Sequence, residues 1–286
     1  MKISEAFKNK KPILSFEIFP PKKEAALQSI DEVLAELCQL KPDFISVTFG
    51  AGGSAVDNKT LELGRKIKAG YGIEPLIHLT CLSYDKADIM AILAALGAEG
   101  LYNILALRGD KNPDITPKDD FRYASDLVAF IRAQGGFSLS GACYPEKHLE
   151  AVDAESDIAH LKIKVEAGVT HLVSQLFFDN EAFFAFVEKV RQAGIGVPIE
   201  AGIMPVTNKK QIERMVSLCG ASLPPKFRRV LDRYEDKPEA LFDAGMAYAI
   251  NQIVDLIASG ADGIHIYTMN KPEVARRICE GIKNLI

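Results

Sequence analysis

Residues 74–108 read EPLIHLTCLSYDKADIMAILAALGAEGLYNILALR, and this stretch decides the fold class. Two short apolar runs, Glu74–Thr80 and Leu101–Arg108, flank a longer run with helical spacing over residues 85–98. Leu96-Gly97 provides a helix stop before the second apolar run, because glycine readily takes the conformation that ends helices. A strand–helix–strand unit of this length predicts two parallel strands joined by a helical crossover.

The same unit repeats along the whole chain. The apolar runs predict eight strands, at Pro12–Phe19, Asp43–Phe49, Glu74–Thr80, Leu101–Arg108, Phe137–Tyr144, Val169–Phe177, Val197–Met204 and Ala261–Thr268. Helical patterns lie near 24–40, 57–70, 85–98, 120–134, 154–168, 180–194 and 209–220, with an extra helical insertion over 224–259 and a last helix over 273–286. Eight such units in about 250 residues predict a closed (β/α)8 barrel of the TIM type, so residues 1–286 are expected to form a single catalytic barrel domain.

A doubly wound open sheet is the alternative for strict strand–helix alternation. Its dinucleotide fingerprint, GxGxxG after the first strand, does not occur there. The nearest match, Gly50-Ala51-Gly52-Gly53, follows the second strand and lacks the third glycine, and no Walker motif is present. These observations favour the barrel.

Composition and charge exclude several classes of protein. Apolar residues make up 48% of the 286 residues and charged residues 25%, which excludes a disordered chain. The net charge of −4 gives no overall attraction to nucleic acid or acidic membranes, and the longest apolar run, Ile89–Ala98, is too short to span a bilayer. Five scattered cysteines and an N-terminus without the apolar stretch of a secretory signal indicate a cytoplasmic protein.

The two faces of the predicted strands differ in polarity. In the first strand Ser15 and Glu17 alternate with apolar residues, whereas in the fourth strand we assign Leu105 and Leu107 to the outer face and Arg108 to the inner one. Because the apolar face of a barrel packs under the helices, the polar face should point inward. Ionisable or amide groups then fall at the carboxyl ends of strands, where barrel enzymes place their chemistry: Glu17, Arg108, Asp110 and Gln175.

Glu17 stands among apolar neighbours in Ser15-Phe-Glu-Ile-Phe-Pro-Pro21. Desolvation there would raise the pKa of the Glu17 carboxyl toward that of a useful general acid. The alternative is a buried Glu17 paired with Arg108. We favour a functional carboxyl, because a lone carboxyl in so apolar a strand costs stability without a partner.

Two further groups of residues have a functional and a structural interpretation. Arg108-Gly109-Asp110 could bind a phosphate or carboxylate and a polar heterocycle, or could form a turn with a local ion pair. Asp157, His160 and Lys164 share one helix face near Tyr144 and His148. Such a face is usually only solvated, but this one adjoins the polar rim of the barrel.

The sequence lacks the motifs that are typical of several kinds of catalysis. The five histidines form no HxxxH or HExxH pattern, so a metal site is not expected. The chain has no GxSxG nucleophile motif, and no lysine lies in a predicted strand, which argues against a Schiff-base enzyme. A polar barrel mouth with one candidate acid suits an organic cofactor that brings its own chemistry.

Specific motifs are spread in order from residue 15 to residue 270. They are Ser15-Phe-Glu-Ile-Phe-Pro-Pro21, Ile45-Ser-Val-Thr-Phe-Gly50, His78-Leu-Thr80, Leu105-Ala-Leu-Arg-Gly-Asp110, Tyr123-Ala-Ser-Asp-Leu127, Ala142-Cys-Tyr-Pro-Glu146 with His148, residues 162–168, Ser174-Gln-Leu-Phe-Phe-Asp179, Gly202-Ile-Met-Pro205 and His265-Ile-Tyr-Thr-Met-Asn270. Together they resemble the bacterial-type 5,10-methylenetetrahydrofolate reductases.

The resemblance implies a flavoprotein oxidoreductase with a ping-pong reaction. NADH reduces FAD and leaves, and 5,10-methylenetetrahydrofolate then enters the same face and becomes 5-methyltetrahydrofolate, which supplies methyl groups for methionine synthesis. The resemblance also implies a chain without the C-terminal regulatory domain of the eukaryotic relatives. We further expect a homo-oligomer, with no nucleic-acid or membrane partner.

The resemblance also assigns roles to residues. Glu17 would be the general acid, Asp110 would hold the pterin and modulate the flavin, and Gln175 would contact both folate and nicotinamide. Tyr267 and Lys271 would bind substrate, with Lys271 in place of an Arg expected near the folate tail. The implied flavin contacts are Thr48, Phe49, Ala51, His78, Arg108, Gly109, Asp110, Ala124, Tyr144, His148, Ala151, Asp157, His160 and Lys164.

Two other classes stay open at this point. One is another flavin- or folate-using barrel, such as a pterin transferase, and bound yellow flavin would decide against the transferase. The other is a non-catalytic barrel that serves as a partner subunit, which reductase activity with a dye acceptor would exclude.

Overall fold

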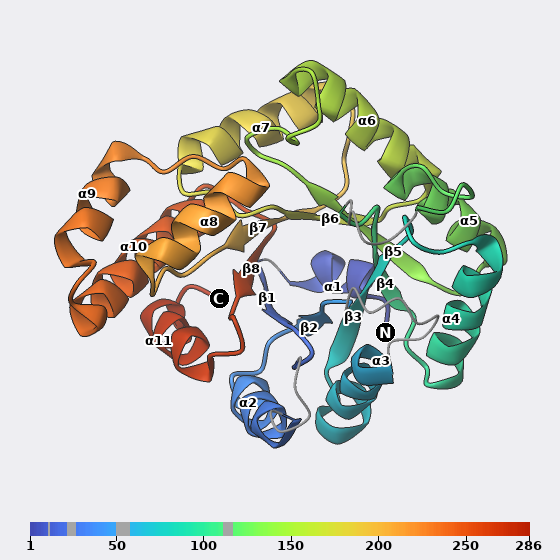
Figure 1. Ribbon diagram of the computed structural model, residues 1–286, viewed down its shortest axis with the longest axis horizontal. Coiled ribbons are helices and arrows are strands. Elements are labelled where there is room, and N and C mark those ends of the chain that lie inside the picture. The colour runs from blue at the N-terminus through green and yellow to red at the C-terminus, as the bar shows by residue number, and fades with distance from the viewer. Residues whose placement is uncertain (11, 22–26, 50–57, 111–116) are drawn as a thin grey trace.

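The computed structural model describes the whole chain except residues 11, 22–26, 50–57 and 111–116. Within the described residues, eight parallel strands close into a barrel in which each strand pairs with the next and β8 pairs with β1 (Figure 1). The strands are β1 (Ile13–Ile18), β2 (Phe44–Val47), β3 (Glu74–Thr80), β4 (Asn103–Leu107), β5 (Ser138–Cys143), β6 (His171–Ser174), β7 (Ile199–Ile203) and β8 (Gly263–Tyr267). The predicted TIM-type barrel is confirmed.

Helices surround the barrel and fill each crossover between strands (Figure 1). They are α2 (Leu27–Gln39), α3 (Asn58–Arg65) extended by the π-helical turn η2 (Lys66–Gly70), α4 (Lys86–Ala98), α5 (Ala124–Gln134), α6 (Ala154–Ala167), α7 (Asn180–Gln192), α8 (Lys209–Cys219), α9 (Pro225–Tyr234), α10 (Pro238–Ala258) and α11 (Pro272–Ile282). The predicted insertion over 224–259 is therefore two helices, α9 and α10. In the described part of the chain, no helix combines the length and the apolar character needed to cross a membrane.

Most of the apolar core lies between the strands and the surrounding helices. Phe16 and Ile18 of β1 are fully buried in this layer, as the alternation in the first strand predicts. The prediction for the fourth strand is wrong: Ala106 packs in the outer layer, while Leu105 packs inside the barrel. The error arose because Arg108 was counted as part of the strand, whereas β4 ends at Leu107 and Arg108 no longer follows its alternation.

A short N-terminal helix, α1 (Ile3–Asn9), lies within the ring of strands in Figure 1 and was not predicted. Its Ile3 and Phe7 pack against inward-facing residues of the strands, among them Phe44 and Leu105. The backbone N–H of Ile3 donates to Asn103 Oδ1 at 2.9 Å. Helix α1 therefore closes the amino-terminal end of the barrel, so that solvent reaches the interior from the opposite end.

Replacing Phe7 by Ala should lower the free energy of unfolding by about 3–5 kcal/mol, because it removes a large side chain from the barrel interior without a group to refill the space. Urea unfolding followed by circular dichroism measures this change. Phe19→Ala is the matched control, since the Phe19 side chain is 37% exposed and its loss should cost much less. Equal losses in both variants would contradict the assignment of α1 as a packed closure.

Candidate active site

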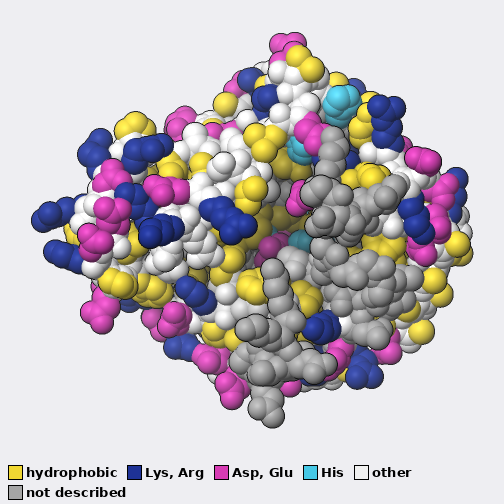
Figure 2. All heavy atoms as spheres, viewed as in Figure 1, with side chains coloured by type: hydrophobic (Ala, Val, Ile, Leu, Met, Phe, Trp, Pro, Cys, Tyr) yellow, Lys and Arg dark blue, Asp and Glu magenta, His cyan; other side chains and the backbone are white. Residues whose placement is uncertain are grey.

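Two adjoining cavities open at the carboxyl end of the barrel. The first, the mouth cavity, measures about 640 Å³ and is lined by residues at or just after the ends of all eight strands. The second, the side cavity, measures about 610 Å³ and lies between the ends of β4 and β5 and the helices α5 and α6. Figure 2 shows a hollow at the centre of this face, with mainly hydrophobic atoms around it.

The predicted site residues come together around these two cavities. Thr48, Phe49, His78, Gly109 and Asp110 line the mouth cavity, Ala124, Ala151, Asp157, His160 and Lys164 line the side cavity, and Arg108, Tyr144 and His148 line both. Glu17, Gln175 and Tyr267 also line the mouth cavity. Ala51 lies outside the described residues. Lys271 lines a small neighbouring pocket that shares Met215 and Tyr267 with the mouth cavity.

Glu17 is held by three side chains from three other strands. Its Oε2 lies 3.5 Å from His78 Nε2, 3.5 Å from His265 Nε2 and 3.5 Å from Ser46 Oγ, which donates a hydrogen bond to it. The carboxyl is 20% exposed, so it reaches the mouth cavity. Burial acts to raise the pKa of Glu17, but the nearby imidazoles of His265 and His78 and the Ser46 hydroxyl together lower it.

The expected rise in the pKa of Glu17 is therefore wrong. The apolar neighbours Phe16 and Ile18 point into the outer layer, so they do not surround the carboxyl. Its surroundings come instead from β2, β3 and β8, which lie far away in sequence. The alternative pairing of Glu17 with Arg108 is not found either, because Arg108 binds Glu150.

Arg108 forms a bidentate ion pair with Glu150 at the edge of both cavities. Its two terminal nitrogens lie 2.7 and 3.0 Å from the two carboxylate oxygens, and this bond raises the pKa of the Arg108 guanidinium. The neighbouring Gly109 has φ +88° and lies against Thr80, so a side chain there would be strained and crowded. The backbone at this turn can therefore approach a ligand closely.

The residues after β5 also face the side cavity rather than solvent alone. The backbone N–H of His148 donates to Asp157 Oδ2 at 3.0 Å, and the rings of Tyr144 and His148 meet edge to face at 4.7 Å. Lys164 Nζ donates to the carbonyl oxygen of Ala142 at 2.7 Å, and burial lowers the pKa of its ammonium group. The functional interpretation of this helix face is favoured over a merely solvated one.

The two cavities fit a dinucleotide with a planar ring. The side cavity presents cationic Lys164 and Arg108, which suit phosphate groups, and Asp157, which suits a ribose hydroxyl. The mouth cavity has apolar walls, including Leu105 and Leu107, which suit a flat heterocycle. No cluster of three or more histidine, cysteine or acidic side chains arranged to hold a metal ion occurs among the residues that the structure describes.

Gln175 and Tyr267 are held in place by hydrogen bonds at the mouth cavity. Gln175 Oε1 accepts a hydrogen bond from the backbone N–H of Leu176 at 2.9 Å, which holds the side-chain amide in one orientation. The Tyr267 hydroxyl donates to the carbonyl oxygen of Ser174 at 2.7 Å. Burial and the negative charge of Glu17 raise the pKa of Tyr267 well above its ordinary value, so it stays a neutral hydroxyl.

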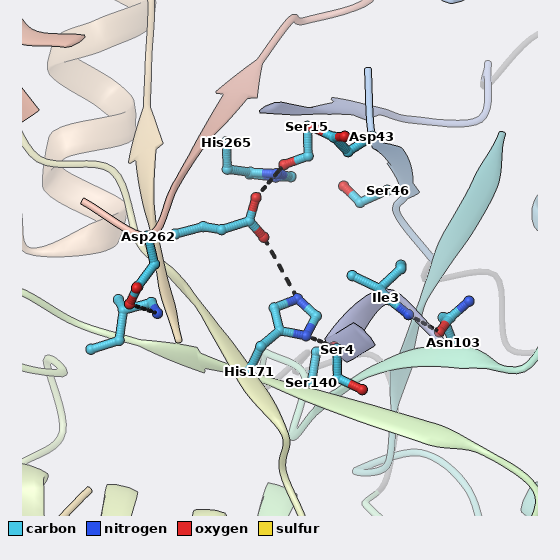
Figure 3. Close-up of polar contacts among 12 residues, drawn as sticks. Ile3, Ser4, Ser15, Asp43, Ser46, Asn103, Ser140, His171, Asp262 and His265 are labelled. Carbon is cyan, nitrogen blue, oxygen red and sulfur yellow. Dashed lines mark hydrogen bonds and ion pairs between the residues drawn. The ribbon is translucent and has the colours of Figure 1, made fainter. Parts of the chain in front are cut away.

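A column of buried polar side chains adjoins Glu17 inside the barrel. Figure 3 shows Ser15, His265, His171 and Ser140 of this column. His265 Nδ1 lies 2.7 Å from Ser15 Oγ, and Ser15 Oγ lies 2.8 Å from Glu200 Oε1. Glu200 Oε2 lies 3.6 Å from His171 Nε2, and His171 Nδ1 lies 2.9 Å from Ser140 Oγ. Apart from Glu17, these side chains are at most 1% exposed.

Glu200 differs from Glu17 in its ionisation. Burial raises the pKa of Glu200 to about 8, an effect that Asp43 and Asp262 strengthen and the Ser15 hydrogen bond only partly offsets. Its Oε2 has no hydrogen-bond partner among the described residues, which is costly for an ionised oxygen but not for a neutral carboxyl. Burial also lowers the pKa of His171 to about 3, so both groups are neutral near pH 7.

Sequence reasoning missed Glu200, Ser46 and Glu150. A signal for Glu200 exists, because the alternation in Ile199-Glu-Ala-Gly-Ile203 places Glu200 and Gly202 on one face and the apolar residues on the other. Ser46 could be found in the same way. Glu150 carries no such signal, since it lies in the loop after β5.

The sequence is similar to known proteins along nearly its whole length. Residues 2–283 match the family model described as methylenetetrahydrofolate reductase. The 5,10-methylenetetrahydrofolate reductase of Escherichia coli is 35% identical over 266 residues, which cover 93% of this chain and 89% of the relative. "Methylenetetrahydrofolate reductase (NADH) 1" of Zea mays is 35% identical over 289 residues, covering 96% of this chain and 49% of the relative. The chain thus spans about half the length of the plant relatives that it matches.

Solved structures share the fold at low sequence identity. An uncharacterised protein from Clostridium thermocellum that binds two copies of 5-methyl-5,6,7,8-tetrahydrofolic acid has a TM-score of 0.67 and 16% identity over 99% of both chains. Tryptophan synthase of Mycobacterium tuberculosis has a TM-score of 0.56 and 12% identity over 98% of this chain and 96% of that one. At these identities, the likeness supports the barrel fold alone.

Glu200→Gln should stabilise the protein more as the pH rises. Folding holds the proton on Glu200 up to about pH 8, whereas the unfolded chain loses it near the ordinary value of 4.5, so Glu200 weakens folding as the pH rises between these values. Glutamine has no such proton to lose. The thermal midpoint should therefore rise several degrees more at about pH 8 than at about pH 5, since 1 kcal/mol corresponds to roughly 2–4 °C in a chain of this size.

Differential scanning calorimetry at the two pH values measures this effect. Glu99→Gln, a surface substitution of the same type, is the control and should give a pH-independent difference. A stabilisation by Glu200→Gln that is equal at both pH values would show that Glu200 is ionised in the folded protein, contrary to the assignment.

Proposed function

The chain belongs to the methylenetetrahydrofolate reductase family, and we propose that it reduces 5,10-methylenetetrahydrofolate to 5-methyltetrahydrofolate with NADH as the reductant and FAD as the resident cofactor. The observation that carries the proposal is Glu17 at the floor of the mouth cavity, next to a side cavity with cationic and hydroxyl-binding groups. The names of the relatives from Escherichia coli and Zea mays support the same reaction and reductant. The product would supply methyl groups for methionine synthesis.

The residues around the two cavities would hold FAD. Arg108 and Lys164 would bind its phosphates, Asp157 and His160 its sugar hydroxyls, and the mouth cavity its ring. Bound there, FAD would supply the hydride chemistry between NADH and the folate. For Arg108 to bind a phosphate, its bond to Glu150 must open, and Glu150 is exposed enough to move away into solvent.

This chain's own residues would bind the folate and move a proton. Glu17 would protonate the folate nitrogen, so that the five-membered ring opens to the iminium that accepts a hydride. Asp110 and Gln175 would bind the pterin, since both line the mouth cavity with Glu17. The lowered pKa of Glu17 means that the carboxyl is ionised in the resting site and must receive its proton before it acts.

The proposal also includes a cytoplasmic location and assembly into a homo-oligomer. The five cysteines are free thiols, as expected for a protein in a reducing cytoplasm. Assembly into a homo-oligomer stays a prediction.

Glu17→Gln separates the two half-reactions. The variant should still take up FAD and still be reduced by NADH, because that step needs no proton from Glu17. Reoxidation by 5,10-methylenetetrahydrofolate should fall by about 10²–10⁴-fold, the usual contribution of a general acid. Stopped-flow absorbance of the bound flavin measures both rates. Equal damage to both half-reactions would mark Glu17 as structural, and a parent protein that binds no FAD would contradict the proposed function itself.

Lys271→Ala tests the binding of the folate tail. Lys271 Nζ donates to Thr207 Oγ1 at 3.1 Å beside the mouth cavity, where a carboxylate of the folate tail could replace this partner. The variant should raise the KM for the folate by about fivefold or less with little change in kcat, because a partly exposed ion pair contributes about 0.2–1 kcal/mol. Lys271→Arg should restore the KM, and Lys283→Ala, on the surface after α11, is the control. An unchanged KM at low ionic strength would show that Lys271 does not bind the folate.

A further inference from the structure

The buried column places a row of polar side chains beside Glu17 that does not pass through the mouth cavity. It runs from Glu17 through His265 and Ser15 to Glu200, with neighbouring polar atoms 3.5, 2.7 and 2.8 Å apart. The first distance exceeds the about 2.7–3.2 Å of an ordinary N–H···O bond, so a movement of a few tenths of an ångström completes the chain. Proton transfer along hydrogen-bonded side chains needs this kind of continuity.

The Ser15 hydroxyl has one proton, so it can donate a hydrogen bond to only one of its two neighbours, Glu200 or His265. If Ser15 donates to Glu200, then Nδ1 of His265 must carry a proton to donate to Ser15. If Glu200 carries its own proton on Oε1, it donates to Ser15, and Ser15 donates to a bare Nδ1. In that second state His265 carries its proton on Nε2, the atom that faces Glu17. The state of Glu200 is thus coupled to the proton that Glu17 meets.

We propose that Glu200 stores a proton which Ser15 and His265 deliver to Glu17 when Glu17 acts as the general acid. The proposal rests on the proposed function and adds to it the source of the proton. Glu200, Ser15 and His265 act through Glu17 and are therefore positioning residues, since of these four only Glu17 lines the mouth cavity.

The transfer balances in protons and charge. Glu200 gives its proton to Ser15 Oγ, Ser15 gives its own proton to His265 Nδ1, and His265 gives the Nε2 proton to Glu17. Glu200 ends as a carboxylate and Glu17 as a neutral acid, while Ser15 and His265 keep their original charge. The proposed reaction consumes one proton per turnover, so one transfer serves one folate.

The two carboxyls differ in a way that suits storage and delivery. The raised pKa of Glu200 and the lowered pKa of Glu17 keep the proton on Glu200 in the resting protein. The groups that face Glu17 are Ser46 on β2, His78 on β3, and His265 and Tyr267 on β8. The groups that act on Glu200 are Ser15 on β1, His171 on β6, Asp43 before β2 and Asp262 before β8.

The difference in exposure between Glu200 and Glu17 determines how Glu200 regains its proton. Glu200 and its neighbours in the column are at most 1% exposed, whereas Glu17 is 20% exposed to the open mouth. After product release, water in the mouth cavity can protonate Glu17, and the proton then returns to Glu200, where it is bound more tightly. A folate that fills the mouth cavity would displace this water, so the stored proton supplies the reaction while solvent is excluded.

The pH profile of the folate half-reaction tests the proposal in the FAD-loaded protein. The parent rate should fall as the pH rises through about 8, where Glu200 loses its proton. Ser15→Ala and Glu200→Gln should slow this half-reaction at least about tenfold at neutral pH, within the about 10⁴-fold ceiling for a general acid. In both variants the fall should shift to lower pH, because Glu17 then depends on solvent alone. Reduction by NADH should be unchanged.

Ser140→Ala is the matched control. Ser140 is as buried as Ser15 and lies against the Nδ1 atom of a histidine in the same way, but it belongs to the far end of the column. It should leave both the rate and the pH profile at the parental values. A parental pH profile in Ser15→Ala and Glu200→Gln, or an equal shift in Ser140→Ala, would overturn the proposal, whereas no folate reduction by the parent would overturn the proposed function instead.

A second readout needs neither cofactor nor activity. In protein labelled with ¹⁵N-histidine, the proton of the neutral His265 ring should lie on Nε2 while Glu200 is protonated and should move to Nδ1 as Glu200 ionises. Ser15→Ala should abolish this change, while Ser140→Ala should preserve it. If Nδ1 of His265 keeps the same protonation state through this pH range in the parent, the column does not couple Glu200 to Glu17 and the proposal fails.

Discussion

A carboxylate inside a barrel must find hydrogen-bond donors or give up its charge, and the two glutamates of this barrel meet that constraint in opposite ways. Glu17 lies within 3.5 Å of two imidazoles and a hydroxyl and keeps its charge. Glu200 is fully buried with the Ser15 hydroxyl 2.8 Å away, and it keeps its proton. The separation of a charged and a neutral carboxyl within one polar column determines what the site can do.

The fold supplies the conditions for this separation. Helix α1 closes one end of the barrel with apolar side chains, and the column side chains are at most 1% exposed, whereas Glu17 is 20% exposed. The loops at the other end build a mouth cavity with apolar walls and a side cavity lined by charged groups. In the proposed function, binding and proton transfer would therefore use different layers of the same barrel.

Much of this architecture could be predicted from the sequence. The repeated strand–helix units identify the barrel, and the alternation in β1 and β8 correctly places Glu17 and His265 inside it. The helix α1 was missed because its seven residues show too short an apolar pattern. The predicted inner and outer faces of β4 were wrong because the assignment followed Arg108, which lies beyond the end of the strand.

The pKa of Glu17 could not be predicted from its neighbours in sequence. Its partners His78, Ser46 and His265 come from three other strands, and only the closed barrel brings them to one carboxylate. The same holds for the bond between Arg108 and Glu150, which joins two loops. Local sequence determines which side chains point inward, whereas the register between strands determines which of them meet.

Infrared spectroscopy of the ligand-free protein is the most direct test of the central claim, that Glu200 is protonated and Glu17 ionised at neutral pH. A protonated carboxyl has a carbonyl stretch well separated from that of a carboxylate. We predict a buried carboxyl band near pH 7 that disappears in Glu200→Gln, persists in Glu17→Gln, and fades in the parent as the pH rises through about 8. A band that persists in Glu200→Gln and is lost in Glu17→Gln would contradict the account, because the proton would then rest on Glu17.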